Sequence, residues 1–277
     1  VIERQGLALW INDQSLRYHP NMAKLRVLAL EQQKNDVLID ALQLSPGDRV
    51  LDCTCGLGAD AILENIAKEG FRPDDLTHIF ITHAHLGHWG GAAAIRAATR
   101  TEIWVPAAAR HLMEHIEEDR TILQNFKFGR YPEQLKVESC TPDHVFGDGE
   151  RIAFGKFALD TILVQGHTKD STCLALDING RRVLFTGDVL FYAGKLGIIN
   201  AEGSSLEDYR RDIQKLADLN VDMLLPGHGV FILGGGQKHI DRGMRMLNDF
   251  VLPETFFETN EFTWQQDYQS SMGSLDA

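Results

Sequence analysis

The chain has 277 residues, of which 44% are hydrophobic, and its formal net charge is −12 at pH 7. That length allows a sizeable core in one large domain. The acidic balance, without a basic stripe, argues against a nucleic-acid partner, and the lack of any run of 18 apolar residues argues against a membrane span.

Short apolar runs bounded by turn residues predict strands along most of the chain. In chain order these runs are 49–54, 78–82, 102–106, 151–155, 157–166, 173–178, 181–187 and 221–227. Helical periodicity alternates with them, over 59–69, 90–99, 107–119, 204–219 and 236–250. Paired strands interleaved with helices predict a mixed α/β fold with at least one sheet built from hairpins.

Three local signals refine this pattern. Asn179-Gly180 separates two strand-like runs and predicts a two-residue β-hairpin. Ser204 and Glu207 have the spacing of a capping box, which predicts a helix beginning at that serine. The span 120–136 has weak periodicity, and we expect it to be an excursion over the surface.

The stretch THAHLGHWGG at 82–91 places three histidines in six positions. His83 and His85 follow a predicted buried strand and lie two residues apart, so their side chains leave extended backbone in the same direction. Two imidazoles that leave a rigid strand together are preorganised for one metal ion. His88 comes where a helix begins, and we expect its ring to point to a neighbouring position.

Further candidate ligands follow three other predicted strands. They are His167 in GHT, Asp188 in TGD and His228 in PGHG. Each fragment alone is a weak signal, but four strand-end fragments in series predict a metal site. The remaining histidines are expected to be ordinary surface or core residues: His19, His78, His111, His115, His144 and His239.

The series of fragments, over about residues 76–250, resembles the metallo-β-lactamase superfamily of hydrolases. The resemblance implies a four-layer αββα sandwich with the metals at one edge, between the two sheets. It also implies one zinc held by His83, His85 and His167, a second held by His88 and His228, and Asp188 bridging both. Asp52 matches an aspartate that usually gives structural support in that family.

One position departs from the family motif, which has an aspartate ligand of the second metal where this chain has Gly87. Glycine has no side chain to donate. The first site keeps three imidazoles, a set that suffices for a catalytic zinc with an open position. We therefore expect one or two zinc ions, with the second site weakened.

The expected activity is metal-assisted hydrolysis of a small-molecule ester, thioester, lactone or lactam. Asp188 is expected to position the nucleophile and accept its proton, Tyr192 to donate a hydrogen bond to the developing oxyanion, and Lys195 to bind a substrate carboxylate. For Tyr192 and Lys195 the alternative is an ordinary buried aromatic side chain and a solvated lysine. Asp170 or Ser171 is expected to support the histidines. The alternative is a non-catalytic, metal-binding descendant that lost its chemistry with the aspartate at Gly87.

A second resemblance concerns the segment 16–61, which looks like the opening of certain class I methyltransferases that use S-adenosylmethionine. A strand ending at Asp52 and the turn at 56–58 would let a nucleoside approach the backbone. A single short glycine-rich turn is weak support. No second strand with an acidic ribose ligand follows at the right distance, so this remains the less favoured alternative.

We expect a single domain over 1–277, with an atypical N-terminal part at 1–62 and a C-terminal extension at 251–277. The aromatic residues of that extension would suit a pocket or a homodimer contact. The opening residues lack a basic segment before an apolar run, so no signal peptide is expected. Four cysteines at this length do not form a disulfide framework, and reduced thiols in a cytoplasmic protein are expected: Cys53, Cys55, Cys140 and Cys173.

Overall fold

The structure is a computed structural model, and it describes residues 2–3, 6–11, 14–17, 51–52, 63, 66–67, 71–116, 121, 138–251 and 254–256. Its first large sheet is parallel, with strands in the order β4-β5-β6-β7. These strands are β4 (Leu51–Asp52), β5 (His78–Phe80), β6 (Glu102–Pro106) and β7 (His144–Phe146). The connections that follow β5 and β6 carry helices that cover this sheet, as crossovers between parallel strands usually do.

The second large sheet has the strand order β12-β11-β10-β9-β8 and is antiparallel except for the parallel pair β11–β12. Its strands are β8 (Arg151–Phe154), β9 (Phe157–Leu163), β10 (Thr172–Ile178), β11 (Arg181–Gly187) and β12 (Met223–Pro226). A separate antiparallel sheet near the N-terminus contains β1 (Ile2–Glu3), β2 (Gly6–Ile11) and β3 (Gln14–Arg17).

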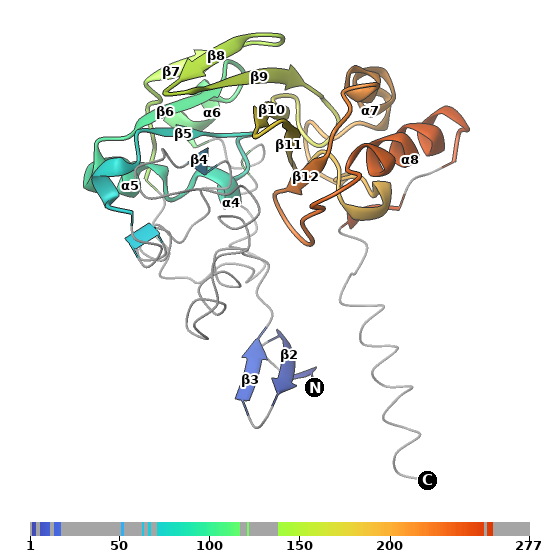
Figure 1. Ribbon diagram of the computed structural model, residues 1–277, viewed down its shortest axis with the longest axis horizontal. Coiled ribbons are helices and arrows are strands. Elements are labelled where there is room, and N and C mark those ends of the chain that lie inside the picture. The colour runs from blue at the N-terminus through green and yellow to red at the C-terminus, as the bar shows by residue number, and fades with distance from the viewer. Residues whose placement is uncertain are drawn as a thin grey trace.

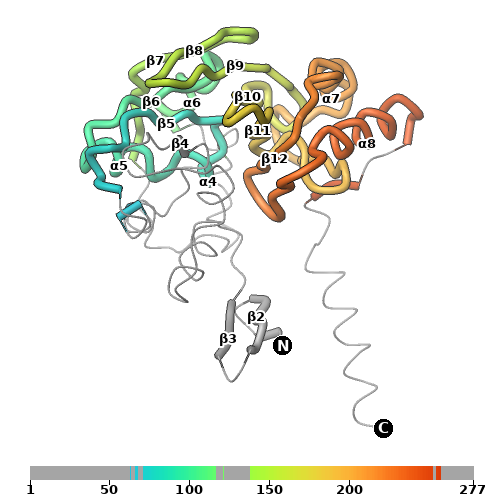
Figure 2. Tube along the Cα trace, viewed as in Figure 1, coloured from blue at the N-terminus to red at the C-terminus, as the bar shows by residue number. Residues whose placement is uncertain are grey.

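Helices lie on both outer sides of the two large sheets (Figure 1). On one side are α4 (Leu86–Trp89), α5 (Ala92–Thr99) and α6 (Arg110–His115), with the 3₁₀ turn η1 (Pro73–Asp75). On the other are α7 (Leu206–Asp212), its 3₁₀ continuation η4 (Ile213–Leu216), α8 (Gln237–Asn248) and the turn η3 (Tyr192–Gly194). The colour gradient in Figure 2 shows that each side comes from one half of the chain.

Three apolar cores separate four layers. Strand β10 shows how the sequence builds them: Leu174 and Leu176 face the core between the sheets, whereas Cys173 and Ala175 face the core under α7 and α8. This alternation follows from the two-residue period of a strand whose two faces are both covered. On the opposite side, Ile79 packs under α5 and α6. The expected αββα sandwich is therefore confirmed.

Local details agree with the sequence in some places and differ in others. Asn179 and Gly180 both have positive φ, and Ile178 pairs with Arg181, as a two-residue hairpin requires. The cap of α7 is Ser205, whose side chain accepts from the Asp208 backbone NH, so the expected capping box at Ser204 is wrong. Ser204 instead donates its hydroxyl hydrogen to the carbonyl of Gly166.

Several helix limits also differ from expectation. The helix expected over 90–99 is present as α5, which begins at Ala92, and a turn at 90–91 separates it from a further short helix, α4, which begins at Leu86. Strand β7 was not expected, and it extends the first sheet beside β6. The span 120–136 lies almost wholly outside the described residues, as do Cys53 and Cys55. The two other cysteines, Cys140 and Cys173, are buried free thiols.

Within the described residues, no helix is both long enough and apolar enough to cross a bilayer.

Candidate metal centre

The first three candidate ligands lie on the loop and short helix that follow β5. His83 and His85 stand in the loop, and His85 is the extended residue immediately before α4. His88 lies within α4, so its side chain leaves a helical turn rather than a strand. All three side chains are buried. A strand end followed directly by a helix thus presents three imidazoles from six consecutive residues.

The other three ligand candidates come from loops of the second sheet. His167 follows β9, Asp188 follows β11 and His228 follows β12. Glycines make this close approach possible: a Cβ atom on Gly227 would lie 2.6 Å from Asp188 Oδ1 and 2.8 Å from His88 Cε1. A larger residue there would displace two of the candidate ligands.

Asp188 stands at the centre of the cluster. Its Oδ2 atom lies 3.3 Å from His88 Nε2, 3.4 Å from His228 Nε2 and 3.6 Å from His167 Nε2. The two rings of His88 and His228 have their centroids 5.2 Å apart. One carboxylate oxygen is thus shared among three imidazoles that arrive from three different loops.

Two groups of side chains satisfy the spacing that a metal needs. His83, His85 and His167 form one group, and His83, His88 and Asp188 form the other; in each, the possible ligand atoms lie within 4.8 Å of one another. His228 lies outside the second group, although it is close to Asp188. The structure therefore brings all six candidate ligands together, and His83 belongs to both groups.

The orientation of the His167 ring is fixed by a backbone carbonyl that is not one of the candidate ligands. Its Nδ1 atom donates to the carbonyl of Gly197 at 2.5 Å, and its Nε2 atom lies 2.8 Å from His85 Nδ1. A neutral imidazole that donates from Nδ1 carries a lone pair on Nε2. The backbone carbonyl thus directs that lone pair into the cluster, as the outer partners of metal-bound histidines usually do.

Buried polar atoms without partners show that the cluster fits a metal ion. Among the described residues, His83 Nε2, His85 Nε2, His88 Nδ1 and Asp188 Oδ1 are buried and make no hydrogen bond. Buried polar atoms are normally satisfied, and several orphaned atoms at one place are a costly arrangement unless an ion is bound. Imidazoles with a carboxylate are ligands that suit a divalent transition metal.

Electrostatics favour the protonation states that bind metal. Burial, reinforced by the neighbouring imidazoles, holds the pKa of His83 and of His85 well below the usual value. Burial alone would raise the pKa of Asp188, but His228 and His88 outweigh it and hold that pKa well below its usual range. Neutral imidazoles around an ionised carboxylate are the forms that coordinate a cation.

A comparison with family models supports the same assignment. Residues 30–228 match the model of the metallo-beta-lactamase superfamily, which is more than half of the chain. The chain belongs to the metallo-β-lactamase superfamily. The match begins before residue 51 and ends at His228, and so includes all six candidate ligands.

Relatives within the superfamily are named hydrolases. The chain is 28% identical over 220 residues to the hydroxyacylglutathione hydrolase GloC of Haemophilus influenzae, covering 76% of this chain and 88% of that protein. It is 25% identical over 237 residues to the acyl-coenzyme A thioesterase MBLAC2 of Bos taurus, covering 79% of this chain and 77% of that protein. The expectation of a hydrolase of this superfamily is confirmed at that level.

Solved structures show the same fold. A metallo-β-lactamase with a HARLDQ motif from Cronobacter sakazakii is similar with a TM-score of 0.56 and 21% sequence identity. The similarity covers 72% of this chain and 80% of that one. At this identity the likeness concerns the αββα architecture of the superfamily.

Two expected site residues stand apart from the six ligands. The Tyr192 side chain lies on η3, where its ring packs 5.0 Å from that of His239, and the residue is 56% exposed. Lys195 forms an ion pair with Glu254 at 2.9 Å. The structure thus places these two side chains against α8 and the chain at 254, and it does not bring them into the metal cluster of this metallo-β-lactamase superfamily protein.

The expected supporting residues act on loops rather than on imidazole rings. Asp170 Oδ2 accepts from the Ala84 backbone NH at 2.6 Å, which ties the loop after β9 to the loop that holds His83 and His85. Ser171 Oγ accepts from the Thr168 backbone NH, next to His167. Both therefore fix the backbone on which the ligands stand.

Tyr209 is a supporting residue that the sequence analysis missed. Its buried hydroxyl donates to the carbonyl of Val189 at 3.0 Å and accepts from the Gly197 backbone NH at 3.2 Å. Gly197 accepts from His167 Nδ1, so Tyr209 supports the first ligand group indirectly: it holds Gly197, and Gly197 orients His167. The signal available in the sequence was a tyrosine on the apolar face of a helix, which usually finds a polar partner when buried.

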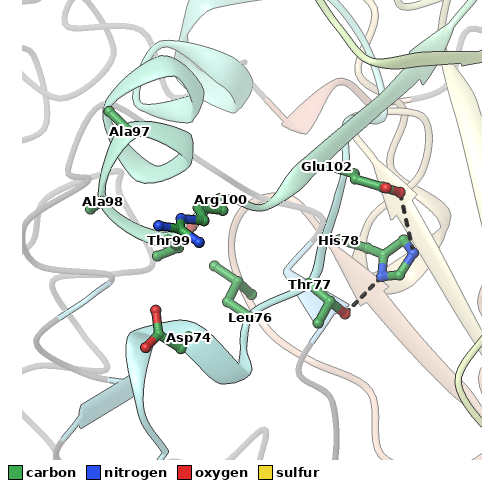
Figure 3. A pocket seen from close by; sticks show the side chains of 9 residues that line it. All are labelled: Asp74, Leu76, Thr77, His78, Ala97, Ala98, Thr99, Arg100 and Glu102. Atoms are coloured by element: carbon green, nitrogen blue, oxygen red, sulfur yellow. Dashed lines mark hydrogen bonds and ion pairs between the residues drawn. The ribbon is translucent and has the colours of Figure 1, made fainter.

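A pocket also lies away from the cluster, at the N-terminal ends of β5 and β6 (Figure 3). His78 within it lies 2.7 Å from Thr77 Oγ1 and 3.7 Å from Glu102, which is an ordinary polar environment for a histidine. The lining residues are Asp74, Leu76, Thr77, His78, Ala97, Ala98, Thr99, Arg100 and Glu102. None of the six candidate ligands lines this pocket, so we assign it no part in the chemistry.

Proposed function

We propose that this protein is a zinc-dependent hydrolase of small-molecule thioesters, with esters as the next class. The observation that carries the proposal is the shared Asp188 carboxylate, which has three imidazole nitrogens within 3.6 Å of one oxygen. Two relatives whose names give a thioesterase and a hydroxyacylglutathione hydrolase support the choice of bond. Zinc is proposed because its protein ligands are mostly imidazole, thiolate and carboxylate groups.

The residues of the site divide the work between them. A bound zinc polarises a carbonyl and makes water a nucleophile near neutral pH. His83, His85 and His167 would hold one ion, and His88, His228 and Asp188 a second. Asp188 would be ionised and able to bind metal, because its pKa is held low. Its Oδ1 atom, which makes no hydrogen bond, would be the proton acceptor for the water. The ligands other than His228 are buried, which keeps bulk water away from them.

The test is a turnover panel with the purified 277-residue chain. Acyl-coenzyme A and acylglutathione thioesters, a p-nitrophenyl ester, a lactone and a chromogenic β-lactam would be compared at equal zinc. We expect the thioesters to be hydrolysed fastest, with activity lost after chelation and restored by zinc. Turnover that survives chelation would refute the metal mechanism, and preference for the β-lactam would refute the proposed substrate class. No turnover of any substrate by the zinc-loaded protein would favour the non-catalytic alternative.

The methyltransferase resemblance of 16–61 remains a prediction, because most of that segment lies outside the described residues.

Gly87→Asp is expected to strengthen the second ligand group. Gly87 is a residue of the short helix α4 and is not among the residues with positive φ, so an aspartate fits its backbone. The new carboxylate would add a ligand and offset part of the cation charge. We expect affinity for the second zinc to rise about ten-fold, the lower end of what one outer partner contributes, and thioester turnover to rise with it.

Metal stoichiometry under chelator competition measures this effect, and Gly87→Asn is the matched neutral control. A folded Gly87→Asp protein with unchanged zinc affinity and unchanged turnover would show that position 87 does not reach the second group.

A further inference from the structure

The residues after α8 return to the metal centre. Leu196 donates its backbone NH to the carbonyl of Glu254 at 3.0 Å, and Phe256 donates its backbone NH to the carbonyl of Leu196 at 2.8 Å. Leu196 and Thr255 thereby form a parallel bridge. The Thr255 hydroxyl adds a bond to the carbonyl of Ile198 at 2.8 Å. We call residues 254–256 the strap.

The strap lies beside the backbone that orients the first ligand group. Gly197, which accepts from His167 Nδ1, stands between the two residues that the strap contacts. The Tyr209 hydroxyl, which comes from α7, accepts from the backbone NH of the same glycine. Because α7 already secures Gly197, the first ligand group has a second support that does not depend on the strap.

The strap places an aromatic ring beside His228, a proposed ligand of the second zinc. The Phe256 ring stacks on the buried Phe191 ring, with centroids 4.1 Å apart and planes 14° apart. It is also nearly parallel to the His228 ring, at a centroid distance of 6.3 Å. Gly229 has φ +82°, and a Cβ atom there would lie 2.9 Å from Phe256 Cε2. The phenylalanine ring thus packs directly on the backbone that follows His228.

His228 needs such support more than the other ligands do. Its side chain is 22% exposed, whereas those of His88, His167 and Asp188 are 4% exposed or less. His228 also lies between Gly227 and Gly229, which have no side chains that could restrict the rotamer of its imidazole. An imidazole with access to solvent loses rotamer freedom when it binds a metal, and packing beforehand reduces that entropic cost.

We propose that Phe256 is a positioning residue that holds His228 toward Asp188 and thereby sets the affinity of the second metal. The inference rests on the metal centre of the proposed function and extends it to a part of the chain beyond the matched family segment, which ends at residue 228. Phe191 supports the Phe256 ring by stacking on it, and Phe256 in turn restricts the His228 ring.

The experiment measures Zn²⁺ binding to the full chain by competition with a chromophoric chelator, for wild type, Phe256→Ala and Phe256→Leu. We expect Phe256→Ala to weaken the second zinc by roughly 10–100-fold, the effect usual for an outer support, and to leave the first zinc unchanged. Phe256→Leu keeps apolar bulk and should give an intermediate loss. Phe250→Ala is the matched control, because Phe250 is 80% exposed and its ring contacts Arg210 instead.

Melting temperatures in excess chelator separate positioning from general stability. Phe256→Ala with two zinc affinities equal to wild type would overturn the inference, and so would equal weakening of both zinc ions. If Phe256→Ala does not fold, the Leu variant decides by the same criteria. Wild-type protein that binds fewer than two zinc ions would overturn the two-group centre itself, a result distinct from failure of the Phe256 variant alone.

Discussion

His85→Ala is expected to lower thioester turnover more than about 100-fold, because even outer partners of metal ligands contribute roughly 10–100-fold. The Nδ1 atom of His85 lies 2.8 Å from His167 Nε2, inside the first ligand group. Its removal leaves two imidazoles where a catalytic zinc site uses three protein ligands. Elemental analysis and turnover with zinc-loaded protein measure the two consequences together.

The control for this substitution is His111→Ala. His111 lies on α6, where it is exposed and its ring is 4.3 Å from that of His115. We expect that variant to keep its metal content and its rate. A His85→Ala protein that retains wild-type metal and turnover would show that the first ligand group lies elsewhere.

Asp188→Asn is expected to have an effect of similar size through a different cause. The substitution keeps the shape of the side chain but removes the charge that faces His88, His167 and His228. We expect both zinc ions to bind more weakly and turnover to fall more than about 100-fold, because the proton acceptor and the shared ligand are lost together.

A calorimetric zinc titration and the turnover panel test this prediction, with the exposed Asp249→Asn as control. If Asp188→Asn bound two zinc ions with native affinity and lost only turnover, Asp188 would be a proton acceptor without a ligand role. Native turnover would exclude both roles.

Much of the sandwich was predictable because most of its strands are short apolar runs bounded by turn residues. In β10, Leu174 and Ala175 belong to different cores, so both faces of the strand are apolar and the sequence shows an apolar run there. The hairpin at Asn179-Gly180 was also predictable, since few residue pairs accept positive φ at both residues of a two-residue turn. The candidate ligands were predictable as a set because each follows a strand, and strand ends of packed sheets meet at an edge.

Other features depend on contacts that no local pattern records. Strand β7 has three residues, too few to show alternation, and pairing with β6 alone defines it. The cap at Ser205 rather than Ser204 was decided by Gly166, which engages the earlier serine. Tyr209 and Phe256 support ligands that are distant in sequence, and only the folded chain brings those segments together.

The first ligand group draws its imidazoles from both halves of the chain, with His83 and His85 beside the parallel sheet and His167 beside the antiparallel one. During synthesis, His228 leaves the ribosome about 145 residues after His83, a delay of roughly 7–30 s at usual elongation rates. A nascent chain therefore offers a metal the three imidazoles of residues 83–88 long before His167, Asp188 and His228 emerge. Because the remaining ligands follow strands of the second sheet, stable metal loading must come after the two sheets dock. The rate of metal uptake by newly made protein would therefore report the rate of that docking step.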